Sequence, residues 1–124
     1  MAVPHHSDDP WTRVRTAHDL PADEVISAFQ KEMRRGNTEN AGLLAYEMLI
    51  SSPELEAVLW SRLQVISVEV VGYWNLNVPV LVETLYQMHL RIPRGRGDRY
   101  LFAIHVVRVL STSQKERGSD EQYE

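Results

Sequence analysis

Between Pro53 and Gly72, apolar side chains recur at the spacing of a single long helix. One face of this segment is formed by residues at intervals of four, four, three and four, namely Leu55, Leu59, Leu63, Ile66 and Val70. A second apolar line is formed by Val58, Val65 and Val68. A helix that is apolar along two lines is typical of the centre of a helical domain, so we expect it to be buried on more than one side.

Helix start and stop signals divide the rest of the chain into further helices. Gly36, which follows two arginines, ends the first predicted helix, and Ser52 followed by Pro53 begins the central one. The expected helices cover about residues 20–35, 39–50, 53–72, 77–90 and 99–113. On the fourth, the spacing places Val78, Leu81, Leu85 and Met88 on one apolar face. We therefore expect an all-α fold of about five helices in a compact orthogonal bundle, with no strand.

The chain of 124 residues has the size of one domain, and its 44% hydrophobic and 24% charged residues are typical of a globular protein. We expect residues 1–20 to form an extended N-terminal arm that docks through Trp11 and Val14. Residues 21–113 are expected to form the single helical domain, and residues 114–124 a polar C-terminal tail.

The sequence contains no cysteine, which excludes disulfides, thiolate catalysis and cysteine-based zinc sites. The N-terminal residues lack the positive start and apolar core of a signal peptide, and no apolar run approaches the roughly 20 residues that span a bilayer. We therefore expect a cytoplasmic protein without a membrane partner.

Three segments resemble, in this order, a known family. They are Phe-Gln-Lys-Glu-Met-Arg-Arg-Gly-Asn at 29–37, Leu-Gln-Val-Ile-Ser-Val-Glu-Val-Val-Gly at 63–72, and Leu-Ser-Thr-Ser-Gln-Lys at 110–115. They resemble the C-terminal helical region of the MgsA/RarA family of AAA+ ATPases, which are relatives of the Werner-helicase-interacting proteins. The positions that match the first two motifs are Gln30, Lys31, Arg34, Arg35, Gly36, Ile66, Glu69 and Gly72.

The resemblance implies an all-helical domain similar to the collar of clamp loaders, which assembles those ATPases into oligomers. It also implies a homo-oligomer, dimeric or tetrameric, and an AAA+ ATPase of DNA replication or repair as a partner. The family's Ser-Glu-Asp reads Val68-Glu69-Val70 here. The chain has no Gly-x-x-x-x-Gly-Lys-Ser/Thr phosphate loop, so we do not expect it to hydrolyse ATP by that mechanism. It is expected to be either a fragment or a free-standing relative of the domain, and the starting Met and an N-terminal arm unlike the family's favour the free-standing relative.

Glu69 is the carboxylate that the sequence singles out, because valines surround it on the central helix. A half-buried carboxylate is costly unless it is paired. We expect a structural contact to Arg34, Arg35 or Arg62, with Glu69 and Arg62 as a polar core. Exposure to solvent is the alternative, and a catalytic or metal-binding role has the least support.

Arginines concentrate in a loop rich in proline and glycine, at Arg91, Arg94, Arg96 and Arg99. Together with Arg34 and Arg35 they are the candidate contact for nucleic acid or a partner, because guanidinium groups and flexible backbone can bind phosphate together. The alternatives are a solvated loop and, for Arg34 and Arg35, stabilisation of a helix C-terminus. A net charge of −4 argues against a dedicated nucleic-acid binder.

No catalytic, cofactor or metal site is predicted. The histidines have no ligand spacing, and no serine lies in a Gly-x-Ser-x-Gly motif. Tyr73, Trp74 and Tyr86 are expected either at an interface or in the core. The leading hypothesis is a non-catalytic helical domain for oligomerisation and protein interaction. The alternative is a nucleic-acid-binding accessory protein that uses the Arg91–Arg99 loop.

Overall fold

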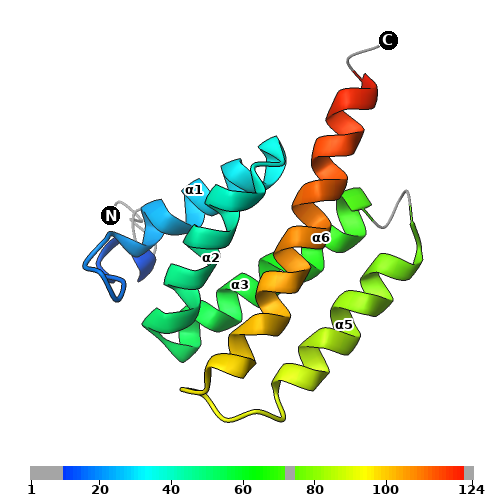
Figure 1. Cartoon of the computed structure of the whole chain (residues 1–124). Coiled ribbons are helices and arrows are strands. Elements are labelled where there is room, and N and C mark those ends of the chain that lie inside the picture. Colours follow the sequence, from blue (N-terminus) through cyan, green and yellow to red (C-terminus); the bar gives the residue numbers. More distant parts are fainter. Residues whose placement is uncertain (1–9, 72–74, 122–124) are drawn as a thin grey trace, which may run out of the picture.

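The computed structural model describes residues 10–71 and 75–121, and the side chains of 10–69 and 75–116. These residues form five α-helices, a short 3-10 helix and a π-helical turn, and they contain no β-strand, which confirms the all-α class. The elements are η2 (Pro10–Thr12), α1 (Ala22–Arg35), α2 (Thr38–Ser51), α3 (Pro53–Ile66), η3 (Ser67–Val71), α5 (Asn77–His89) and α6 (Gly97–Glu121). Figure 1 shows α1 and α2 as a helical hairpin, α3 crossing behind α6, and α5 beside α6 at the edge of the bundle.

The predicted helix boundaries around the first connection are confirmed. Gly36 has a left-handed φ of 70°, and its N–H donates to the carbonyl of Met33 at 3.1 Å. The side chain of Asn37 then caps α2 by accepting from the N–H of Asn40, and Ser52 caps α3 in the same way. Because so few residues join the helices, α1 and α2 must pack antiparallel.

The core is built from all five helices, and α3 runs through it. Leu55, Leu59 and Leu63 are fully buried, as the main stripe predicts. The second apolar line is not buried, because Val65 and Val68 are both exposed. The physical reason is that α2, α5 and α6 all pack against α3, whereas α1 packs on α2 and α6 and leaves one side of α3 uncovered.

On α5 the predicted apolar face is buried only in part. Val78 is buried and Leu85 packs half-buried against the core, whereas Leu81 and Met88 are exposed and Val82 and His89 are buried in their place. His89 turns inward because its ring stacks on the indole of Trp60, with ring centroids 4.6 Å apart. This contact joins α5 to α3 and sets the face that α5 presents to the core.

The chain on either side of the bundle differs in part from the expected arm and tail. Trp11 and Val14 pack against the core, as predicted, although Pro10–Thr12 forms a 3-10 helix. At the other end, α6 continues past the expected end at Ser113 to Glu121. The run of Gln, Lys, Glu and Arg at 114–117 favours this extension. In the part of the chain that the structure describes, no helix is long and apolar enough to cross a membrane.

Candidate interaction surface

The polar core predicted at Glu69 and Arg62 is not present. Both side chains are exposed, and among the described residues no ion pair joins Glu69 to Arg34, Arg35 or Arg62. Arg35 instead pairs within α1, to Glu32 at 3.1 Å. The prediction fails because Val65 on α3 and Val68 on η3 are themselves exposed, so Glu69 lies on a side of the bundle that meets solvent.

A buried ion pair lies elsewhere, between Glu56 and Arg99. The side chain of Glu56 is 4% exposed and that of Arg99 is 14% exposed. The Arg99 Nη2 and Nε donate to the two carboxylate oxygens at 2.9 and 3.0 Å, and its Nη1 donates to the carbonyl of Ile92 at 2.7 Å. The hydrogen bond to Glu56 raises the pKa of Arg99. Because each residue lies in the first turn of its helix, the pair ties the start of α3 to the start of α6.

This ion pair changes the role of the predicted arginine loop. Arg94 also donates to Glu56, at 3.2 Å, so two of the four loop arginines, Arg94 and Arg99, share one buried carboxylate. Arg96 pairs with the exposed Asp98 at 3.0 Å, and Arg91 lies in solvent. The structure therefore brings Arg94 and Arg99 together around an acid rather than around an open anion site.

A second buried carboxylate, Glu47 on α2, holds the N-terminal segment against the bundle. It accepts a hydrogen bond from the hydroxyl of Thr16 at 2.7 Å and one from the backbone N–H of His18 at 2.8 Å. The His18 Nδ1 lies 2.6 Å from its other oxygen. Burial alone would raise the pKa of Glu47, but the hydrogen bonds and charge of these partners outweigh burial and lower it. The interaction is structural, since it fastens the loop before α1 to α2.

Tyr86 belongs to an aromatic cluster in which its ring meets Trp60 edge-on, with centroids 5.4 Å apart. His89 completes the cluster, and burial lowers its pKa, which favours the neutral ring. Of the two predicted locations for Tyr86, an interface or the core, the structure shows the core. Tyr73 and Trp74 lie outside the described residues.

Within the described ranges, no three His, Asp or Glu side chains come close enough to hold a metal ion. Both buried carboxylates are engaged by cationic or hydroxyl partners. These two carboxylates thus join elements of the fold, whereas the buried Trp60 Nε1 has no hydrogen-bond partner among the described residues.

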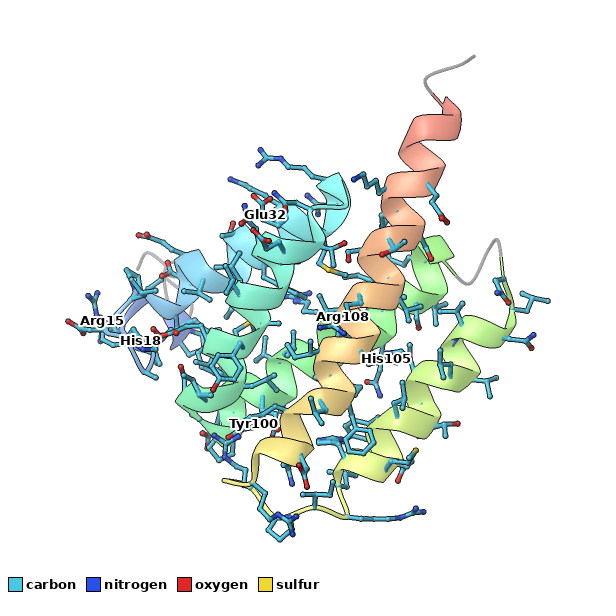
Figure 2. The ribbon with its side chains drawn as sticks, viewed as in Figure 1. Arg15, His18, Glu32, Tyr100, His105 and Arg108 are labelled. Carbon is cyan, nitrogen blue, oxygen red and sulfur yellow. The ribbon has the colours of Figure 1, made fainter. Side chains whose placement is uncertain are left out.

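Exposed apolar side chains are most frequent along α5 and the start of α6. Of the eleven large exposed ones among the described residues, six lie on α5, beside its two ends or in the first turns of α6, and they are Leu76, Val80, Leu81, Met88, Leu90 and Leu101. We call this set the α5/α6 surface. α5 forms the edge of the molecule in Figure 1, and Figure 2 shows His105 and Arg108 on the neighbouring helix α6.

Sequence reasoning missed Glu56 and Glu47, although a signal for Glu56 was present. Glu56 stands four residues before Trp60 and seven before Leu63, so the helical spacing that marks the core also marks this carboxylate. No protein-family model, curated protein or solved structure matches the chain. The likeness to the AAA+ collar therefore stays a prediction from sequence motifs.

Proposed function

We propose that this chain is a non-catalytic helical interaction domain that self-associates through its α5/α6 surface. The observation that carries the proposal is the grouping of exposed apolar side chains there, with Val80 and Leu101 each 65% exposed. Removing one such side chain from water is worth about 1.5–3 kcal/mol. Single exposed leucines are common on protein surfaces, but a group of them along one edge helix is typical of an interface.

The arrangement on α5 suits a symmetric contact between two copies. Leu76 and Val80 are one turn apart on its outer side, while Leu81 and Met88 are two turns apart along its flank. A two-fold axis beside α5 would bring the same surface of both copies together. A stable interface needs roughly 800 Å² from each partner. An area of roughly 800 Å² is a tenth of the 7950 Å² of accessible surface of the chain. The outer side of α5 together with the start of α6 can supply an area of this size.

The sequence resemblance adds a candidate partner, namely an AAA+ ATPase of DNA replication or repair. This part of the proposal rests on the motifs alone. The nucleic-acid alternative gains no support from the geometry, because Glu56 engages Arg94 and Arg99. We therefore propose no second function.

The experiment is light scattering of the purified chain over a wide concentration range. We expect a dimer or tetramer for the wild type, and a monomer with unchanged helical circular dichroism for the double variant Val80→Glu/Leu101→Glu. Leu43→Glu on α2 is the matched control, because Leu43 is 67% exposed but lies outside the α5/α6 surface. A wild type that is monomeric at every concentration overturns self-association. Equal dissociation of the Leu43→Glu variant overturns its assignment to α5 and α6.

A further inference from the structure

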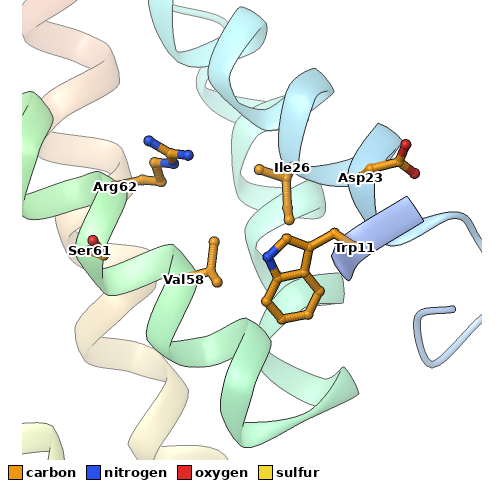
Figure 3. Close-up of a pocket in the computed structure, with 6 residues that line it drawn as sticks. All are labelled: Trp11, Asp23, Ile26, Val58, Ser61 and Arg62. Atoms are coloured by element: carbon orange, nitrogen blue, oxygen red, sulfur yellow. The ribbon is translucent and has the colours of Figure 1, made fainter. Parts of the chain in front are cut away.

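A groove runs between α1 and α3 on the side of α3 that the other helices leave uncovered. Both helices pack on α2, but they scarcely touch each other. Two hollows of about 280 and 180 Å³ lie along this groove, and Arg62 lines both. Gln114 of α6 also lines the smaller hollow. Figure 3 shows one of them, with Val58 and Arg62 projecting from α3 toward Ile26 on α1.

The two walls of the groove are helical faces of equal length. On α3 and η3 the lining residues recur every three or four positions from Val58 to Glu69, and on α1 they recur in the same way from Asp23 to Arg34. At 1.5 Å per residue each wall is about 16 Å long, which corresponds to three helical turns. A groove of this length can hold three turns of an added helix.

The floor of the groove is lined by apolar side chains and its rim by charged ones. Ile26 and Met33 are buried in its floor, Val58 and Ile66 are half-buried, and Val65 is exposed along the α3 wall. These positions are far enough apart to receive apolar side chains from successive turns of a bound helix.

The charges of the rim favour an acidic residue at the centre of the ligand. Arg62 lies midway along the groove and Arg34 lies near one of its ends, and both side chains are exposed. Among the described residues, neither arginine forms an ion pair. The acids Asp23 and Glu69 lie toward opposite ends. Charge complementarity therefore places an acid opposite Arg62 and disfavours an acid at the end beside Asp23, whereas Arg34 balances Glu69 at the other end.

One end of the groove already holds an apolar side chain from outside the helical bundle. The indole of Trp11 lies with Ile26 and Val58 at the hollow that Figure 3 shows. Trp11 comes from the segment before α1 and packs against the core. Trp11 therefore adds an apolar wall to the hollow beside Ile26 and Val58.

We infer that the α1/α3 groove binds an amphipathic α-helix of another protein, with its apolar face on Val58, Val65 and Ile66 and a central acid facing Arg62. A bound strand would instead need a sheet edge, and both walls here are helical with their backbone groups paired internally. The groove uses none of the residues of the α5/α6 surface. Self-association and helix binding can therefore fail independently.

The test begins with selection of binders from a displayed library of randomised peptides of about 16 residues, long enough to span the groove. We expect enrichment of sequences with apolar residues at i, i+3 or i+4, and i+7, together with one central Asp or Glu. The best peptide is then labelled with fluorescein, and its affinity is measured by anisotropy. Val65→Glu and Arg62→Glu should each weaken binding at least about tenfold.

Controls place the binding on this groove. Arg108→Glu reverses an exposed charge on α6 away from the groove and should leave affinity unchanged. When the peptide library is selected for binding to the Arg62→Glu variant, the enriched peptides should carry Lys or Arg in place of the central acid. The inference is overturned if no helical spacing is enriched, or if Arg62→Glu and Val65→Glu bind as the wild type does. It is also overturned if only Val80→Glu/Leu101→Glu loses binding, because the peptide would then occupy the α5/α6 surface.

Discussion

Replacing Glu56 with alanine removes the carboxylate that ties α3 to α6. At 14% exposure the guanidinium of Arg99 has little access to solvent, so it would lose its charge partner without gaining hydration. Breaking a buried ion pair by removing one partner costs about 3–5 kcal/mol. We expect about 3 kcal/mol, at the lower end, because Arg94 is more exposed and can turn toward water. A domain of this size has a total stability of about 5–15 kcal/mol, so the loss is large.

The assay is urea unfolding followed by far-ultraviolet circular dichroism, with the free energy of unfolding taken from the midpoint and slope. Asp98→Ala is the matched control, because its pair with Arg96 is 64% and 63% exposed and should contribute less than about 1 kcal/mol. The double variant Glu56→Leu/Arg99→Met should recover much of the loss, since it removes both buried charges and the more exposed Arg94 can turn toward water. If Glu56→Ala costs no more than Asp98→Ala, the pair does not join the two helices as the geometry implies.

Three further changes test the cap and the buried titratable groups. Gly36→Ala should lower the free energy of unfolding in urea more than Gly95→Ala does. Both glycines have a positive φ, of 70° and 97°, but only a Cβ added at Gly36 would meet the Cβ of Lys115, at 2.6 Å. Burial lowers the pKa of His89 in the folded chain below its usual 6.5. The unfolded chain therefore binds a proton at His89 more readily than the folded chain does, and the stability of the fold decreases as the pH drops below 6.5. His89→Phe should flatten this fall between about pH 6.5 and pH 5, and an unchanged slope would contradict it. The pKa of Glu47 in the folded chain lies below its usual 4.5. The ionised carboxylate therefore stabilises the fold fully above pH 4.5, and this stabilisation is lost as the pH falls through the folded-state pKa. Glu47→Gln should therefore show a shallower acid loss in the same assay, and equal slopes would count against the contact.

The sequence by itself determined the class of fold and most helix boundaries. These depend on signals within a few residues of one another, such as the left-handed glycine at Gly36 and the Ser52 cap before Pro53. The Leu55, Leu59 and Leu63 stripe was equally readable, since its spacing is uninterrupted. Local hydrogen bonding and periodicity are sufficient to predict such features.

Only the tertiary structure decided which faces of α3 and α5 are covered and which charges meet. α5 carries apolar residues on several sides, so its rotation depends on a neighbour, and the stacking of His89 on Trp60 sets it. Glu56 and Arg99 are 43 residues apart, and no local pattern shows that the starts of α3 and α6 coincide. The α1/α3 groove likewise exists because α1 packs on α2 and α6 instead of on α3. Burial and ion pairing are properties of the assembled helices, because each depends on which surfaces come together when the chain folds.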